Sequence, residues 1–300
     1  MDSVFACLYK KSDVALKIRV MKNQITAVLL FLIATTGSIS AQTPVSYDTS
    51  SYNAAIAFAF PDTAGNLYLR QLREENALAS LTDMLPSDQS KALAILDWTH
   101  RQWTHNGSNQ PTKNDALTIL KEAREGEKFR CVEYGIVSSK ALQSLGYRAR
   151  LLSLKTKDVE TTKYGAGHVL AQVWLPDVKK WAFIDGQFNV MPMLNGVPLN
   201  VVEFREAIQD KKAFTLNNSK GEVSRRDQRH YLSFVTDYIY YLDTPFDNRQ
   251  SITTERKKIN GKSSLMLVPL GAKNPTVFQR GYKMDHALYT NAIRDFYPEF

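Results

Sequence analysis

The order of hydrophobic patterns along the 300 residues predicts an α+β fold. Apolar residues recur at helical spacing up to residue 145, and from residue 147 onward they alternate with polar ones. Pro176-Asp177 marks a turn between two alternating stretches, which indicates antiparallel strands. A hydrophobic content of 44% and an aromatic content of 11% allow a chain of this length to bury a substantial core.

Four helices precede the sheet in this prediction, at residues 67–85, 88–105, 115–125 and 131–145. Pro86 ends the first helix, Asn114 caps the third, and Gly146 ends the fourth. The fourth is the best supported, because its apolar residues keep helical spacing over their whole length.

The predicted strands span residues 147–154, 168–175 and 181–185. A short helix is expected at 201–209, and two further strand-like pieces at 264–270 and 276–282. Between them lie a polar stretch at 217–228 and a tyrosine-rich segment at 230–241. We expect the tyrosines to pack this C-terminal region onto the rest of the chain.

The first residues resemble a secretory signal peptide. Five basic residues precede an apolar run from Ile25 to Ala34, and small residues up to Ala41 follow it. The run is too short for a membrane-spanning helix, which needs about 20 apolar residues. We therefore expect residues 1–41 to be a cleaved leader, with translation starting at Met1 or Met21. This predicts an exported protein, periplasmic or extracellular, without a stable membrane span after cleavage.

The charge pattern argues against a nucleic-acid partner. The chain has a formal net charge of +8, and removal of residues 1–41 would leave about +5. The basic residues are scattered rather than gathered in a stripe or a recognisable nucleic-acid-binding module. We also find no motif for a cofactor, a phosphate loop or a metal site.

Cysteine usage points to one candidate nucleophile. Cys7 lies in the expected leader, so the mature chain would hold Cys131 alone, without a possible internal disulfide. Cys131 begins the fourth predicted helix, and the partial positive charge of a helix N-terminus favours a thiolate. Neighbouring Arg130 acts in the same direction, whereas Glu133 opposes it. A buried, inert cysteine is the alternative interpretation.

His168 and Asp185 supply the residue types that a thiol nucleophile needs. An imidazole can take the thiol proton and return it to a leaving group, and a carboxylate can orient the imidazole. His168 begins one predicted strand and Asp185 ends the next. Because the two strands form an antiparallel pair, these positions come together at one end of the sheet.

These residues resemble the transglutaminase-like branch of the papain-like cysteine enzymes over residues 88–190. The resemblance rests on three blocks in the same order: Cys131 and its helix with the following Gly146-Tyr147-Arg148-Ala149-Arg150, then Gly167-His168-Val169, then Trp181-Ala182-Phe183-Ile184-Asp185. It implies a papain-like or transglutaminase-like core in which the nucleophile helix packs on an antiparallel sheet. Carried over by residue, it implies Cys131 as nucleophile, His168 as base and acid, and Asp185 as orienting carboxylate.

Two positions depart from the family pattern. Phe129 stands where members usually have glycine, and Gly186 stands where they usually have proline. The oxyanion hole would use the backbone N–H of Cys131 and a second donor from elsewhere. Trp103 is a candidate for that donor through its indole N–H, and Gln187 is a candidate residue in the wall of the site.

The sequence thus predicts three regions: a leader at 1–41, a transglutaminase-like catalytic domain at 42–200, and a C-terminal extension at 201–300. The expected activity is amide hydrolysis or acyl transfer through an acyl-enzyme, on a peptide, protein or cell-envelope substrate. The alternative is a non-catalytic exported binding module on the same fold, with the tyrosine-rich segment as its contact surface.

Overall fold

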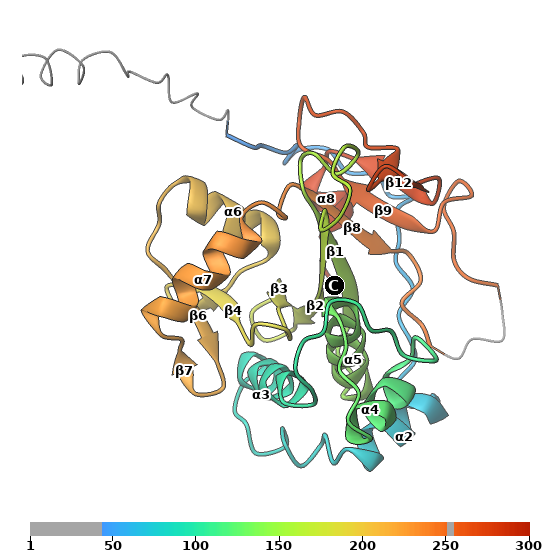
Figure 1. Ribbon diagram of the computed structural model, residues 1–300, viewed down its shortest axis with the longest axis vertical. Helices are drawn as coiled ribbons and strands as arrows, with labels where there is room; N and C mark the ends of the chain where they lie inside the picture. Colours follow the sequence, from blue (N-terminus) through green and yellow to red (C-terminus); the bar gives the residue numbers. More distant parts are fainter. Residues whose placement is uncertain (1–43, 251–254) are drawn as a thin grey trace, which may run out of the picture. The chain divides into compact units, whose positions relative to one another are not determined.

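The computed structural model describes residues 44–250 and 255–300 (Figure 1). The description below concerns the compact unit Val45–Phe300. The expected leader and Cys7 lie outside the described residues. Among the helices of the described part, none has the length and apolar character required to cross a membrane.

The N-terminal half of this unit contains the four expected helices. They are α2 (Leu67–Glu75), α3 (Asp88–His100), α4 (Ala116–Arg124) and α5 (Cys131–Ser144). The prediction was wrong in three details. Helix α3 ends at His100 rather than residue 105. Helix α2 ends at Glu75 rather than residue 85, because Ala77 adopts a left-handed φ of 49° that breaks the helix. Helix α4 is capped by Asp115, whose carboxylate accepts the N–H of Thr118 at 3.0 Å, and not by Asn114.

Helix α5 begins at Cys131 because the residues around it satisfy the exposed backbone donors there. The buried carboxylate of Glu133 accepts the backbone N–H of Arg130 at 3.0 Å and also its guanidinium at 2.6 Å. At the other end the chain turns out of the helix through Gly146, whose φ is +94°. The helix contacts α2, α3 and α4 on its outer sides and β1 and β2 on its inner side.

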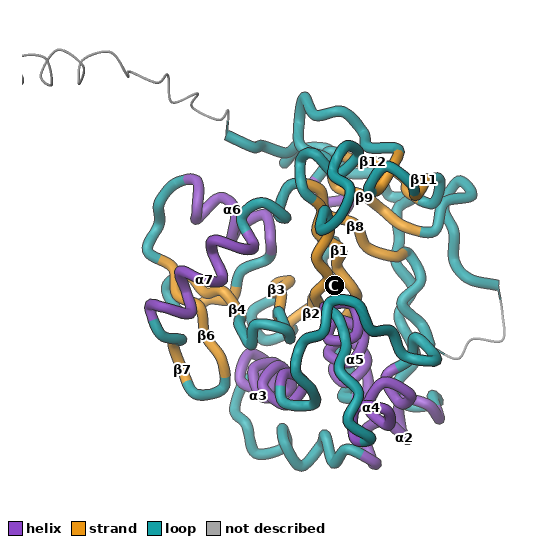
Figure 2. Tube along the Cα trace, viewed as in Figure 1, coloured by secondary structure: helices purple, strands orange, loops and turns teal. Residues whose placement is uncertain are grey.

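A six-stranded sheet lies at the centre of the unit (Figure 2). Its order is β12-β9-β8-β1-β2-β3, with bounds β1 (Ala149–Lys155), β2 (Gly167–Leu175), β3 (Lys180–Ile184), β8 (Tyr241–Pro245), β9 (Ser264–Leu267) and β12 (Ala287–Thr290). All neighbouring pairs are antiparallel except β9 and β12. The predicted α+β class, with the Cys131 helix packed on a largely antiparallel sheet, is confirmed.

The chain beyond residue 200 contributes to this same sheet. Strand β8 pairs directly with β1, with Ser153 opposite Asp243. The remaining elements are β4 (Met191–Leu194), β5 (Val197–Pro198), β6 (Phe214–Asn218) and β7 (Gly221–Glu222) in a second sheet, the hairpin β10 (Val277–Phe278) and β11 (Tyr282–Lys283), and helices α6 (Val201–Gln209), α7 (Arg225–Val235) and α8 (Ile293–Phe296).

The alternation of side chains along β2 divides the core into two layers. Ala171 and Val173 belong to the layer under α5, whereas Leu170 and Trp174 belong to the layer covered by α6, α7 and the C-terminal residues. Gly135 is the point of closest approach between α5 and the sheet. A Cβ atom on Gly135 would lie 3.1 Å from the carbonyl oxygen of Leu170 and 3.0 Å from the Leu151 side chain.

We predict that Gly135→Ala destabilises the fold although alanine is ordinarily the better helix former. The added methyl group would push α5 away from β1 and β2, and such overpacking costs about 1–3 kcal/mol. Urea unfolding followed by circular dichroism would measure the loss. The control is Gly65→Ala, where the nearest atom to a new Cβ lies at 3.5 Å and little change is expected. Equal stability of the two variants would contradict the close approach.

Candidate active site

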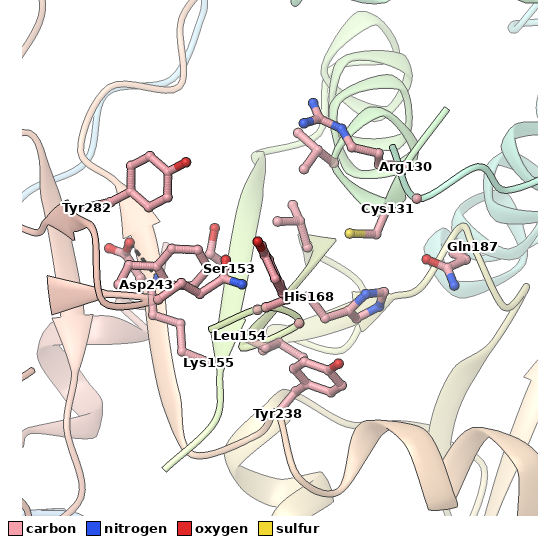
Figure 3. A pocket seen from close by; sticks show the side chains of 18 of the residues that line it. Arg130, Cys131, Ser153, Leu154, Lys155, His168, Gln187, Tyr238, Asp243 and Tyr282 are labelled. Carbon is pink, nitrogen blue, oxygen red and sulfur yellow. Dashed lines mark hydrogen bonds and ion pairs between the residues drawn. The ribbon is translucent and has the colours of Figure 1, made fainter. Parts of the chain in front are cut away.

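Cys131 occupies the first turn of α5 and is half-buried. Its side chain lies beside the imidazole of His168 at the end of the sheet (Figure 3). The neighbouring Arg130 does not act as a free charge here, because Glu133 engages its guanidinium through both Nε and Nη2, at 3.3 and 2.6 Å. The helix N-terminus and the imidazole are therefore the positive groups that face the sulfur.

His168 and Asp185 form a buried pair. The Nε2 atom of His168 donates to Oδ2 of Asp185 at 2.7 Å, and both side chains are at most 1% exposed. The other carboxylate oxygen of Asp185 accepts the backbone N–H groups of Gln187 at 3.1 Å and Phe188 at 3.4 Å. With Nε2 bound to Asp185, the Nδ1 atom is the ring nitrogen left for the thiol of Cys131.

The surroundings of His168 stabilise its protonated form. Burial alone would lower the pKa of the imidazole, but the charge and hydrogen bond of Asp185, together with Cys131, outweigh burial and raise the pKa to about 10. Nearby His105 responds in the opposite direction, because burial and the charge on His168 both lower its pKa. A protonated imidazole beside the sulfur is the arrangement that stabilises a thiolate.

Aromatic rings, two of them from beyond residue 200, enclose the imidazole. The ring of Phe234, on α7, meets the imidazole edge to face with centroids 5.1 Å apart, and the rings of Tyr238 and Phe188 lie at 6.0 and 6.1 Å. Tyr231, also on α7, is fully buried close to Asp185, and burial and that carboxylate raise its pKa. These rings keep water away from the imidazole–carboxylate pair.

A cavity of about 760 Å³ opens beside the sulfur, and we call it the Cys131 cavity. Figure 3 shows Cys131, His168 and Gln187 on one side of it, with Lys155, Asp243 and Tyr282 on the other. Its wall combines residues of α5, β1, β2, β8 and the β10–β11 hairpin. They include His105, Arg130, Cys131, Val132, Ser153, Leu154, Lys155, Tyr164, Gly165, Gly167, His168, Val169, Gln187, Phe234, Tyr238, Asp243, Phe278, Gln279, Tyr282, Lys283, Met284 and His286.

The two residues predicted beside the triad, Trp103 and Gln187, occupy different places. Gln187 lines the Cys131 cavity and also a neighbouring cavity of about 710 Å³. Trp103 lines only the neighbouring cavity, and its buried indole N–H has no hydrogen-bond partner among the described residues. Gln187 thus lines the same cavity as Cys131, and Trp103 does not.

The two departures from the family pattern have structural reasons. Phe129 is buried and packs edge to face against Trp103, with centroids 5.7 Å apart. Gly186 lies against α5, where a Cβ atom would come within 3.1 Å of Tyr134 and 3.2 Å of the Ser138 hydroxyl. A glycine therefore lets the turn after Asp185 pack directly on the helix that carries Cys131.

Comparison with known proteins places these residues within a family. Residues 76–186, which include Cys131, His168 and Asp185, match the transglutaminase-like superfamily. We call this matched segment the transglutaminase-like core, because it is similar to that superfamily over these residues. The expectation drawn from the three sequence blocks is confirmed at the level of the superfamily. Among curated proteins, none matches the chain.

Similarity to solved structures is low. A candidate cysteine protease from Cytophaga hutchinsonii is 14% identical, with a TM-score of 0.33, over 54% of this chain and 55% of its own. A TGase is 20% identical, with a TM-score of 0.28, over 40% and 30% of the two chains. A candidate protease from Parabacteroides distasonis is 15% identical, with a TM-score of 0.29, over 39% and 25%. The matched part thus spans about half of the first of these proteins and less of the others.

Much of the Cys131 cavity comes from outside the transglutaminase-like core. Phe234, Tyr238, Asp243 and the hairpin β10–β11 all follow residue 186. Sequence reasoning missed these residues because no local motif connects them to Cys131. The pairing of β8 with β1 is the feature that brings Asp243 into the cavity wall.

We predict that Cys131→Ala lowers the pKa of His168 from about 10, because Cys131 is one of the groups that raise it. The pKa should stay above 6.5, since Asp185 is retained. NMR titration of the His168 ring proton would measure it, with the ring of His100 as an internal control. By linkage, a raised pKa stabilises the fold fully below about pH 6.5 and progressively less as the pH rises through 10. An unchanged pKa would show that the sulfur does not interact with the imidazole.

Proposed function

We propose that this protein is a thiol-dependent enzyme that cleaves or transfers acyl groups at amide bonds. The observation that carries the proposal is the fully buried His168–Asp185 pair, with Nε2 and Oδ2 2.7 Å apart, beside Cys131 at the wall of a large cavity. The match of this segment to the transglutaminase-like superfamily supports it. In this proposal Cys131 is the nucleophile, His168 the base and acid, and Asp185 the orienting carboxylate.

The first half of the reaction forms an acyl-enzyme. The thiolate of Cys131 attacks the carbonyl carbon of the substrate, and a carbon–sulfur bond forms while the carbonyl oxygen becomes an oxyanion. The backbone N–H of Cys131, the first residue of α5, is the natural first donor to that oxygen. The imidazolium of His168 then gives its proton to the amine nitrogen as the carbon–nitrogen bond breaks.

The second half releases the acyl group. His168, now neutral, takes a proton from water or from an acceptor amine, which attacks the thioester carbon. A new carbon–oxygen or carbon–nitrogen bond forms, the carbon–sulfur bond breaks, and the thiolate–imidazolium pair is restored. Water gives hydrolysis and an amine gives acyl transfer. Asp185 stays ionised throughout and keeps Nε2 protonated, so that Nδ1 faces the reacting atoms.

We propose further that the protein is exported and that its substrate is a peptide, a protein or a cell-envelope component. The support is the sequence of residues 1–41, which resembles a secretory signal peptide, and the size of the Cys131 cavity, at about 760 Å³. A cavity of this volume accepts several residues of an extended chain around a single amide bond.

We predict that iodoacetamide labels Cys131 rapidly well below pH 8.5, the usual pKa of a free thiol. His168→Ala should return the labelling profile to that of an ordinary thiol, because the imidazolium that stabilises the thiolate is lost. Mass spectrometry of the Cys131 peptide would follow the rate and exclude labelling at Cys7. The control is His230→Ala, because His230 is exposed and lines neither the Cys131 cavity nor the neighbouring cavity.

Ordinary thiol behaviour in the wild-type protein would contradict the proposed activity. It would favour the alternative of a binding module in which Cys131 is a structural residue. A folded Cys131→Ala variant that binds its partner normally, without an acyl-enzyme ever trapped in the wild type, would support the same conclusion.

A further inference from the structure

The end of the Cys131 cavity opposite the sulfur contains a second group of charged residues. Lys155, at the end of β1, forms an ion pair with Asp243 on β8, with Nζ and Oδ2 3.0 Å apart. Their side chains are 7% and 10% exposed. His286 approaches the same carboxylate oxygen at 3.7 Å. This group is separate from the His168–Asp185 pair. The proposed reaction therefore assigns no role to Lys155, Asp243 or His286.

One lysine in the cavity wall has no acidic partner among the residues that the structure describes. Near the sulfur, Arg130 pairs with Glu133 and His168 with Asp185. Further along the wall, Lys155 pairs with Asp243. Lys283, on the exposed strand β11, also lines the cavity and takes part in none of the ion pairs among the described residues. It therefore adds a positive charge to the cavity wall without a paired carboxylate in the described part of the chain.

The available hydrogen-bonding atoms point to the same kind of ligand. The Lys155 ammonium has three N–H donors, and within the described residues only Asp243 accepts from it. The second carboxylate oxygen of Asp243 is sealed from solvent and has no hydrogen-bond partner in the described part of the chain. A substrate ammonium could not reach that oxygen, whereas the remaining donors of Lys155 and the charge of Lys283 suit a substrate carboxylate.

We propose that this end of the Cys131 cavity is a specificity subsite for a carboxylate group of an acidic peptide substrate, bound by Lys155 and Lys283. The subsite rests on the proposed function, in which the same peptide is attacked by Cys131. The carboxylate balances the charge of Lys283 and leaves the Lys155–Asp243 pair intact. Two exposed tyrosines that line the cavity, Tyr164 and Tyr282, offer apolar faces to the rest of the peptide.

Matched alkylating probes test the subsite without knowledge of the natural substrate. The neutral probe is N-iodoacetyl-glutamine α-amide. N-iodoacetyl-glutamate α-amide differs from it by a side-chain carboxylate, and N-iodoacetyl-glutamine differs by a free α-carboxylate. Each forms a thioether with Cys131 and releases iodide. The two acidic probes distinguish recognition of an acidic side chain from recognition of a peptide C-terminus.

At low salt we expect one acidic probe to react about three- to tenfold faster than the neutral probe, relative to their rates with 2-mercaptoethanol. The preference should decline as salt shortens the screening length from about 10 Å at 0.1 M to about 3 Å at 1 M. Lys283→Gln should lower the preference at least about threefold, because it removes the uncompensated charge. Lys113→Gln is the matched control, since Lys113 is exposed and lines neither cavity.

Lys155 requires a different variant. Lys155→Gln alone leaves the Asp243 carboxylate buried without its partner, which destabilises the fold. The double variant Lys155→Gln with Asp243→Asn keeps this end of the cavity free of an unpaired buried charge. We expect it to lower the preference for the acidic probe as well, while Lys283 is still present.

The outcomes separate this proposal from the proposed function. Rapid labelling by the neutral probe with equal rates for the acidic probes, or an unchanged preference in Lys283→Gln, would overturn the subsite and leave the thiol chemistry standing. If Cys131 proves unreactive, the subsite can still be tested by NMR titration of Cys131→Ala with acetyl-Ala-Glu-Ala-amide and acetyl-Ala-Gln-Ala-amide. At least threefold tighter binding of the acidic peptide, with shifts at Lys155 and Lys283, supports the subsite, and equal affinity overturns it.

Discussion

Gly135 allows α5 to lie so close to the sheet that a single added methyl group would meet the backbone of β2. Tyr134, which precedes Gly135, and Ser138, about one turn after it, lie against Gly186, directly after Asp185. Helix α5 is therefore in contact both with the strand that carries His168 and with the turn that carries Asp185. Because its own first residue is Cys131, close packing of one helix fixes the relative positions of all three residues. A shift of α5 along or away from the sheet would change every distance in the site.

Burial of the His168–Asp185 pair imposes a second condition. Removing a carboxylate and an imidazolium from water is costly, and their attraction compensates only when the remaining lone pairs are satisfied. The turn after β3 meets this need, since the N–H groups of Gln187 and Phe188 point at the free oxygen of Asp185. On the other side, Phe234 and Tyr238 cover the imidazole and exclude water. Backbone N–H groups stabilise the Asp185 carboxylate. The His168 imidazolium can exchange its proton with the neighbouring sulfur of Cys131.

The sequence was most informative where structure is local. Helix α5 and strands β2 and β3 were predicted nearly to the residue, because each has an unbroken apolar period and a glycine or turn at its end. Residues 76–85 were wrongly assigned to a helix, since leucines at helical spacing continue past the left-handed Ala77. The residue types of Cys131, His168 and Asp185, together with the family resemblance, identified the candidate triad. Lys155 and Asp243 could not be paired in advance, because 88 positions separate them and only the sheet order brings them together.

Two parts of the chain form different parts of the site. In the proposed function, the transglutaminase-like core supplies the nucleophile, the imidazole and the carboxylate, which all lie within residues 76–186. Later residues supply the cover of the imidazole through α7, and the opposite wall of the cavity through β8, β10 and β11. A change in those later elements can alter which peptide fits without moving the reacting atoms, since α5, β2 and the turn after β3 hold each other. In the proposed function, substrate preference therefore depends mainly on residues outside the matched core, such as Asp243 and Lys283.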